Sequence, residues 1–220
     1  MIKTKIDINN WKGKKHYEWF KTYSNHSYSV TKEIEITKLL SYLNSCEKTS
    51  FFIALLYLIT KSLNSIEEMR LRVINNEVYL YDIIHPAYTI MTDEEVFENC
   101  DNLYYEDYHK FYYATKEAIN KIKKGVNDNP YNDFTEFNQF YMTCLPWISF
   151  TGMIHPMPND DSSFVPRICW SKYYERNDKY YISLNINVSH ALVDGYPLSK
   201  AFLKIEENIN NPEQLNLLKK

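Results

Sequence analysis

The segment 182–205 constrains the fold more than any other part of the chain, because two periodicities meet in it. Over residues 182–190, aliphatic side chains alternate with serine and asparagine, which is typical of a strand with one apolar face. Asp194 and Gly195 then turn the chain, and Pro197 suits the first turn of a helix. Apolar residues follow this proline at helical spacing. The segment therefore predicts a core strand, a short corner and an amphipathic helix.

His190 occupies the last position of the alternating pattern, on the same face as the aliphatic side chains. Burial disfavours a charged imidazole, so we expect a neutral ring that accepts a proton near neutral pH. Such a ring, held at a strand-to-helix corner, is a candidate general base. The alternative is a satisfied core histidine beside an Asp194 that only caps the helix. The short pattern His-x-x-x-Asp-Gly by itself favours this alternative.

Composition and the order of the predicted elements indicate one ordinary globular domain. The 220 residues are 45% hydrophobic and 24% charged, and only 4 are glycine, which argues against a turn-rich solenoid. Predicted strands and helices alternate along the chain without a linker. We therefore expect a single domain over residues 1–220, of the α/β class, with a mixed β-sheet covered by helices. The 20 tyrosines and 11 phenylalanines suit ligand pockets and interfaces, or equally half-buried strand positions.

Charge, cysteine spacing and hydropathy argue against several classes of function. The net charge of -3 and the lack of a long basic block argue against nucleic-acid binding. The four cysteines form no Cys-x-x-Cys pair and the histidines are scattered, so no metal site is expected. The amino terminus has no apolar signal core, and the longest apolar run, 51–59, is too short to span a bilayer. We expect a cytoplasmic protein that binds no membrane.

Several segments give specific local predictions. The apolar run 51–63 is longer than most strands and predicts a buried helix. An Asn-Asn pair at 75–76 lies between two strand-like runs and predicts a hairpin, and a second hairpin is predicted around 176–178. The segment 94–124 predicts one long helix, which the Asn-Asp-Asn-Pro sequence at 127–130 ends.

Motifs spread along the whole chain occur in one characteristic order. They are Asn10-Trp11, Ile34-Glu35-Ile36-Thr37, Glu68-Met69-Arg70, His85-Pro86-Ala87-Tyr88-Thr89 with Phe97, Leu145-Pro146-Trp147, Lys172-Tyr173-Tyr174 and the His190 motif. In order and spacing they resemble the chloramphenicol acetyltransferase family. The resemblance implies the fold of CoA-dependent acyltransferases and a homotrimer with active sites at subunit interfaces. It also implies direct transfer of an acetyl group from acetyl-CoA, as co-substrate, to a hydroxyl of chloramphenicol, without a metal.

The resemblance implies catalytic roles for two residues. His190 matches the family's catalytic histidine, which would remove the proton of the acceptor hydroxyl as that oxygen attacks the thioester. Thr143 stands where the family usually has a serine that supports the tetrahedral oxyanion. Threonine keeps the hydroxyl donor and adds a methyl group.

Asp194, the third residue of the implied catalytic set, matches a structural aspartate that holds the histidine corner in place. In the family this aspartate pairs with a basic residue near the amino-terminal tryptophan, where this chain has Gly13. A buried carboxylate without a partner costs several kcal/mol. We therefore expect a substitute donor, with the neighbouring lysines Lys12 and Lys14 as candidates.

Further residues are implied on the two sides of the pocket. Tyr173 and Trp147 match positions on the coenzyme side. Cys169 replaces a pocket threonine that helps to bind an ordered water, and a thiol is a weaker hydrogen-bond partner. The acceptor side is expected to draw on His26, Tyr28, Thr89, Met91, Phe97 and Cys169.

Other interpretations remain open. Several acceptor-side residues, and Asn187, Ser189 and Pro197 around the base, differ from the usual family choices, which allows another small hydroxyl acceptor or a non-catalytic ligand-binding relative. The His-x-x-x-Asp-Gly pattern also resembles the catalytic cores of dihydrolipoyl acyltransferases. A covalent route through Cys144 or Cys169 is disfavoured, because neither has a base nearby in the sequence.

Overall fold

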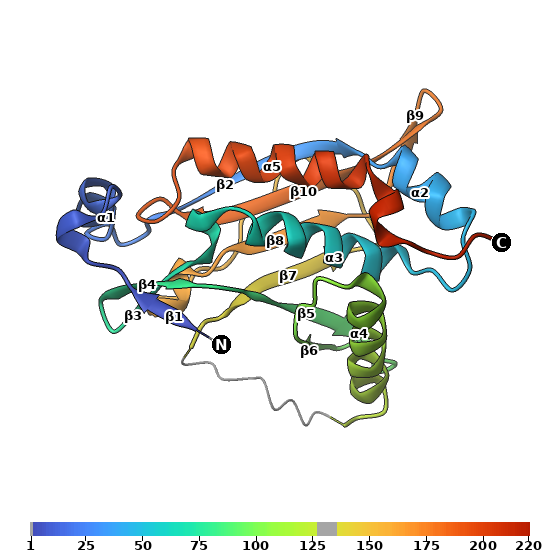
Figure 1. The fold of residues 1–220 in the computed structure, drawn as a ribbon, viewed down its shortest axis with the longest axis horizontal. Coiled ribbons are helices and arrows are strands. Elements are labelled where there is room, and N and C mark those ends of the chain that lie inside the picture. The colour runs from blue at the N-terminus through green and yellow to red at the C-terminus, as the bar shows by residue number, and fades with distance from the viewer. Residues whose placement is uncertain (1, 127–135) are drawn as a thin grey trace.

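The computed structural model describes residues 2–126 and 136–220, which form two β-sheets and a layer of helices (Figure 1). The helices are α1 (Lys14–Phe20), α2 (Thr37–Asn44), α3 (Phe51–Asn64), α4 (Tyr108–Lys123) and α5 (Gly195–Ile209), with the short 3-10 helices η1 (Ile8–Asn10), η2 (Glu67–Arg70), η3 (Asp161–Phe164) and η4 (Pro212–Leu215). The strands are β1 (Lys3–Lys5), β2 (Ser27–Glu35), β3 (Leu71–Ile74), β4 (Glu77–Tyr81), β5 (His85–Met91), β6 (Phe97–Asp101), β7 (Gln139–Leu145), β8 (Arg167–Ser171), β9 (Tyr174–Arg176) and β10 (Lys179–Ser189).

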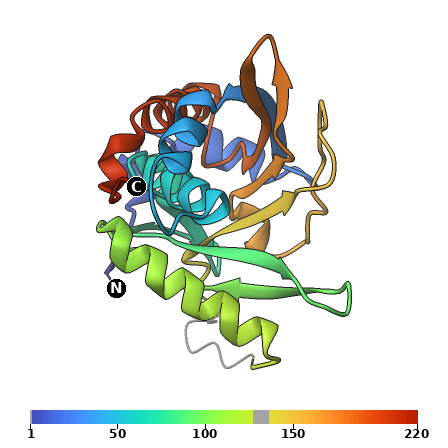
Figure 2. The same cartoon turned by 90° about the vertical axis from the view of Figure 1, so that its right-hand side faces the viewer.

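The larger sheet has the strand order β2-β10-β8-β7-β5-β6, and β9 pairs with β10. The pairs β5–β7 and β7–β8 are parallel and the other pairs are antiparallel, so the sheet is mixed. Helices α3 and α5 pack together across one face of this sheet (Figures 1 and 2), while α4 contacts α3 and β6. The smaller sheet has the order β1-β4-β3. The predicted fold class, a mixed sheet covered by helices, is confirmed.

Helix α3 confirms the predicted buried helix. The Ser50 side chain caps it by accepting the Ile53 amide hydrogen at 3.4 Å. Its residues 53–60 are all buried, as expected for a helix that is apolar on every side. No helix in the described parts of the chain is both long and apolar enough to cross a membrane.

The strand, corner and helix predicted over 182–205 are present. Strand β10 ends at Ser189, and α5 begins at Gly195. The Asp194 carboxylate caps α5 by accepting the Tyr196 amide hydrogen at 2.9 Å. The even-numbered aliphatic residues of β10, from 182 to 188, are 0% exposed in the core. The odd-numbered residues therefore point to the opposite face of the sheet.

The face of the sheet away from α3 and α5 is polar. The strand register places Asp101, Ala87, Tyr141, Arg167 and Asn187 in one row across five strands. The next row on this face contains Asn99, Thr89, Thr143, Cys169 and Asn185. The loop 146–164 lies on this side of the sheet (Figure 2), where its Phe150 and Met153 carbonyls accept hydrogen bonds from Ser183 and Asn185. A polar sheet face that a loop partly covers is a candidate place for a ligand to bind.

Arg72 links the two sheets from within the core. It lies on β3, is 0% exposed, and its guanidinium lies 5.5 Å above the Phe140 ring centroid. Desolvation lowers its pKa to about 9. It donates hydrogen bonds of 2.6–2.9 Å to the backbone carbonyls of Met69, Leu71, Phe137 and Gln139. These bonds connect β3 to the start of β7.

Both predicted hairpins are present, and each turn uses positive φ angles. Asn75 and Asn76, between β3 and β4, have φ of 52° and 65°, and Asn177 and Asp178, between β9 and β10, have φ of 53° and 59°. Asparagine and aspartate tolerate these angles better than most residues.

The prediction of one long helix over 94–124 was wrong. Residues Phe97–Asp101 form β6, an edge strand paired with β5, and α4 begins only at Tyr108. Asp107 caps α4 by accepting the Lys110 amide hydrogen at 2.7 Å. Pairing with β5 supplies backbone hydrogen bonds that a sequence pattern does not reveal, and it overrides the local preference. The predicted helix end at 127–130 lies outside the described residues.

Candidate active site

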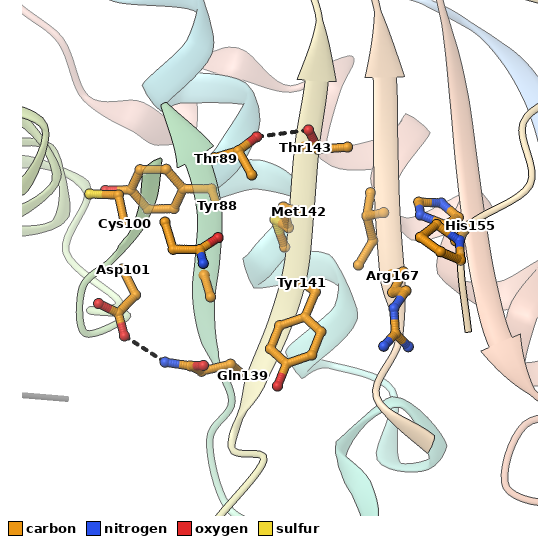
Figure 3. Close-up of a pocket in the computed structure, with 14 residues that line it drawn as sticks. Tyr88, Thr89, Cys100, Asp101, Gln139, Tyr141, Met142, Thr143, His155 and Arg167 are labelled. Carbon is orange, nitrogen blue, oxygen red and sulfur yellow. Dashed lines mark hydrogen bonds between the residues drawn. The ribbon is translucent and has the colours of Figure 1, made fainter. Parts of the chain in front are cut away.

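A cavity of about 430 Å³ lies on the polar face of the sheet (Figure 3). Strands β5, β6, β7 and β8 form its floor, and loop 146–164 contributes His155 and Pro156. Its size suits a small molecule. The lining residues with reactive or hydrogen-bonding side chains include Thr89, Asp101, Gln139, Thr143, His155 and Arg167.

Two threonine hydroxyls meet in this cavity. Thr143 on β7 and Thr89 on β5 have their Oγ1 atoms 2.7 Å apart, and either hydroxyl can be the donor. Both side chains are half-buried and line the cavity. If Thr89 donates to Thr143, the Thr143 hydrogen is free for a ligand oxygen. The pair therefore provides one oriented donor for a developing negative charge.

His190 lies in the corner after β10, where aromatic rings hold it. Its ring stacks on Phe20 with centroids 4.0 Å apart, and the Tyr28 ring centroid is 4.8 Å away. Its backbone N–H donates to the His26 carbonyl at 2.8 Å. The ring is half-buried, and Nδ1 has no hydrogen-bond partner within residues 2–126 and 136–220. The ring contacts that the structure shows for His190 are aromatic, and the backbone pairing with β2 continues to His190.

His190 is not among the residues that line the cavity containing Thr143. One chain therefore carries two separate groups of predicted site residues. We call the ring of His190 with Phe20 and Tyr28 the histidine half-site, and the cavity with Thr89 and Thr143 the hydroxyl half-site. The histidine half-site contains the predicted general base, and the hydroxyl half-site contains the predicted donor to the oxyanion.

Of the other predicted acceptor-side residues, one lies beside the histidine half-site and two lie on the surface. His26 lies beside the histidine half-site, where its Nε2 is 3.2 Å from the Ser163 hydroxyl. Met91 and Phe97 pair across the β5–β6 hairpin and are 41% and 59% exposed. Exposed apolar side chains of this size are common where another molecule or subunit binds.

The expected lysine partner of Asp194 is wrong. Lys12 pairs with Glu68 at 3.2 Å, and Lys14 lies 3.9 Å from Glu18. Neither lysine forms a salt bridge with Asp194. The Asp194 carboxylate is only partly buried and caps α5, and Lys12 interacts with it only at longer range than a salt bridge.

The structure leaves no room for a side chain at position 13. A Cβ atom at this position would lie 2.4 Å from Cζ2 of Trp11. The Trp11 ring in turn packs edge-to-face against Tyr17, with centroids 6.2 Å apart. The tryptophan fills the space in which a basic side chain at position 13 would begin.

Replacing Lys14 with alanine is expected to change the free energy of unfolding by about 0.5 kcal/mol or less, because the lysine makes only surface contacts. These are the 3.9 Å pair with Glu18 and a 3.0 Å hydrogen bond to Asn9. Urea denaturation followed by circular dichroism measures the change. A loss of several kcal/mol would mean that Lys14 does hold the Asp194 corner.

The two candidate thiols are unsuited to carry an acyl group. Burial raises the pKa of Cys144 and of Cys169 to about 12, and the thiolate is the nucleophilic form. Cys169 is 0% exposed and is not among the cavity-lining residues, although it neighbours Thr143 across the β7–β8 pair. A direct transfer without a cysteine intermediate fits this arrangement better.

Tyr173 and Trp147 follow the carboxyl ends of β8 and β7, beyond Thr143. Their side chains are 45% and 59% exposed. The Tyr173 ring lies 5.8 Å from that of Phe51, at the start of α3. The Lys172 amide donates to the Leu145 and Ile148 carbonyls and so joins the two strand ends. Exposed aromatic rings suit the flat or apolar part of a ligand.

Polar residues that the sequence analysis did not identify complete the cavity. Asp101 is buried, its Oδ2 accepts a hydrogen from Gln139 Nε2 at 2.5 Å, and burial raises its pKa to about 6. Arg167 lies two residues before Cys169 on β8, and strand alternation was a signal that could have identified it. His155 and Asp101 gave no such signal, because one lies in a loop and the other in a segment expected to be helical.

Known proteins resemble this chain in sequence and in fold. The family model described as chloramphenicol acetyltransferase matches residues 1–206. Chloramphenicol acetyltransferases from Escherichia coli and Clostridium perfringens are 27% and 29% identical to it, covering 93% and 94% of this chain and 92% and 95% of theirs.

Solved structures resemble the chain as well. A chloramphenicol acetyltransferase superposes with a TM-score of 0.85 at 23% identity, over 94% of this chain and 100% of that one. The cubic core of a pyruvate dehydrogenase multienzyme complex has a TM-score of 0.68 at 12% identity, over 93% and 89% of the two chains, which shows a shared fold alone. The chain is an acyltransferase, and it belongs to the chloramphenicol acetyltransferase family.

Proposed function

We propose that this protein is an acetyl-CoA-dependent O-acetyltransferase that works as a homotrimer, with the whole chain as one catalytic domain. Each active site would combine the histidine half-site of one subunit with the hydroxyl half-site of its neighbour. The observation that carries this proposal is the separation of His190 from the Thr143 cavity within one chain. Chloramphenicol is the acceptor that the names of its relatives support.

The proposed reaction is a direct transfer. Nε2 of His190 accepts the proton of the acceptor hydroxyl while that oxygen attacks the thioester carbonyl of acetyl-CoA. The Thr143 hydroxyl donates to the resulting oxyanion, with Thr89 donating to Thr143. The tetrahedral intermediate then expels the coenzyme thiolate, which takes the proton from His190. Atoms and charges balance without a metal or an acyl-cysteine.

The remaining predicted residues have places in this arrangement. Tyr173 and Trp147 would hold the coenzyme at the carboxyl ends of β8 and β7. His26 and Tyr28 beside the base, with Met91 and Phe97 on the exposed hairpin, would form acceptor walls at the subunit boundary. The four cysteines are free thiols, which is compatible with the cytoplasm, where we place the enzyme.

The direct test of the proposed function is release of the coenzyme thiol from acetyl-CoA on addition of chloramphenicol, with the acetylated product identified by mass spectrometry. Turnover that depends on both substrates supports the proposal. Thiol release that other small alcohols stimulate, and chloramphenicol does not, would reassign the acceptor. No transfer to any hydroxyl compound would favour a binding protein without catalysis.

Mixed trimers test the shared active site. His190→Ala and Thr143→Val subunits are each expected to be nearly inactive, since each lacks one half-site. Unfolded together in equal amounts and refolded, they should recover about a quarter of wild-type activity, because in a closed ring one interface in four joins two intact half-sites. A mixture as inactive as its components would show that each site belongs to a single chain.

Another small alcohol is a second candidate acceptor. The cavity contains a buried carboxylate and a guanidinium, Asp101 and Arg167, on the two sides of its floor. Charged side chains in a cavity favour a ligand that carries charged or polar groups over an apolar ligand.

A further inference from the structure

Arg167 has hydrogen-bonding capacity that the described chain does not use. Its Nη1 donates to the Ser162 and Val165 carbonyls at 3.1 and 3.2 Å, and its guanidinium carbon lies 5.4 Å from the Tyr141 ring centroid. The N–H groups on Nε and Nη2 make no hydrogen bond to any residue of the described ranges. The side chain is half-buried in the cavity wall, and desolvation lowers its pKa. A guanidinium in this setting has free, forked donors for an oxyanion.

The surroundings of Arg167 do not neutralise its charge. No carboxylate of residues 2–126 or 136–220 forms a salt bridge with it. Asp160, which acts on it at longer range, is exposed, and its Oδ1 accepts the Ser162 amide and hydroxyl hydrogens at 2.8 and 2.5 Å. The cation therefore has no partner of opposite charge at contact distance.

Burial disfavours the charged form of the neighbouring imidazole. His155 Nε2 lies 3.0 Å from Asn185 Oδ1, while the Asn185 amide nitrogen donates to Thr31 and Met153. Oδ1 is thus the acceptor, and Nε2 carries the hydrogen. Burial lowers the pKa of His155, which favours the form with an unprotonated Nδ1. The positive charge on this side of the cavity belongs to Arg167 alone among the residues that line it.

The opposite side of the cavity carries a negative group. Asp101 and Arg167 stand in one row across β6, β5, β7 and β8, so their Cα atoms are about 14 Å apart at the usual strand spacing. Figure 3 shows them on opposite sides of the cavity. Asp101 Oδ1 is buried without a hydrogen-bond partner in the described residues. An anionic ligand group is therefore repelled from the β6 side and attracted to the β8 side.

The register also relates Arg167 to Thr143. Arg167 pairs with Tyr141, two residues before Thr143 on the neighbouring strand, so the two Cα atoms are on the order of 8 Å apart. A hydroxyl at Thr143 and an anionic group at Arg167 fit within one small molecule. We propose that the acceptor is a small alcohol that carries a carboxylate or phosphate, which Arg167 binds while the hydroxyl is acetylated. This proposal rests on the acetyl transfer proposed above. It favours the second candidate acceptor over chloramphenicol, which carries no anionic group.

A pair of matched acceptors tests the charge preference. N-(4-nitrobenzoyl)-serine and its methyl ester have the same hydroxyl and aromatic ring and differ in one negative charge. The wild-type protein is expected to acetylate the acid with a kcat/KM about tenfold or more above that of the ester. Arg167→Met should remove this preference, so that the kcat/KM values for the acid and the ester become similar. The control Arg176→Met, which removes an exposed guanidinium paired with Glu33, should keep the preference.

Calorimetric binding of the two compounds in the presence of CoA separates the possible failures. If the wild type binds the acid more tightly than the ester and Arg167→Met does not, the anion site is supported, even if no acetyl group is transferred. If the coenzyme thiol is then not released, only the proposed acetyl transfer is contradicted. Equal affinity and equal kcat/KM for acid and ester in the wild type would overturn the anion site, as would a preference that persists in Arg167→Met. If Arg167→Met fails to fold, Arg167→Lys retains the charge and should show a smaller preference for the acid.

Discussion

Replacing His190 with alanine is expected to lower the rate of acetyl transfer by about 10²–10⁴-fold, which is the contribution of a positioned general base. The fold should survive, because the ring is half-buried at a corner and its Nδ1 has no hydrogen-bond partner in the described structure to leave unpaired. The measurement is kcat/KM for thiol release, with circular dichroism and sedimentation to verify folding and assembly. Added imidazole should restore part of the activity, since the substitution opens a space between Phe20 and Tyr28.

The control for this prediction is His16→Ala. His16 is an exposed residue of α1, and its loss should leave the rate unchanged. Rescue by imidazole distinguishes a missing base from a disturbed corner, because a structural defect would not respond to a small proton acceptor. An enzyme with His190→Ala that keeps normal acetylation would remove His190 from the mechanism.

Replacing Arg72 with methionine is expected to lower the free energy of unfolding by about 2–4 kcal/mol. Methionine fills much of the volume but donates no hydrogen bond, so the carbonyls of Met69, Leu71, Phe137 and Gln139 lose these donors inside the core. Removing a desolvated charge offsets part of this loss, since burial already lowers the pKa of Arg72 to about 9. Chemical denaturation measures the net effect.

Arg176→Met serves again as the matched control, because it removes an exposed guanidinium that pairs with Glu33. Its effect on stability should be small. Equal stability of Arg72→Met and the wild type would mean that the four carbonyls find other donors. In that case Arg72 would not be what connects β3 to β7.

Strong hydrophobic periodicity and characteristic turn residues correctly predicted the strands, helices and hairpins in which they occur. The alternation over 182–188 and the apolar run 51–63 lie in the core, where one face or all faces of an element are buried, and burial imposes periodicity on the residues. The Asn-Asn pair at 75–76 predicted its hairpin because the turn itself requires positive φ. The segment 94–124 failed because β6 is stabilised by pairing with β5, a partner that its own residues do not specify.

The candidate site followed from sequence only in part. Motif resemblance identified His190 and Thr143, and the structure brings Thr143 together with Thr89. The resemblance did not reveal that Lys12 and Lys14 pair with glutamates, or that the Asp194 carboxylate caps α5. The partner of an exposed charged side chain depends on the position of its charged group in the folded protein, and the spacing of residues in the sequence does not give that position.

The sequence by itself determined the fold class, the strand-to-helix corner that carries His190 and the family, because burial periodicity and ordered motifs are properties of the chain. Only the tertiary structure decided that His190 lies outside the cavity that Thr143 lines, and that Asp101 and Arg167 face each other across that cavity. These residues are distant in sequence, and the register of four strands brings the cavity residues together. Register is a property of the assembled sheet, so no single segment could have disclosed it.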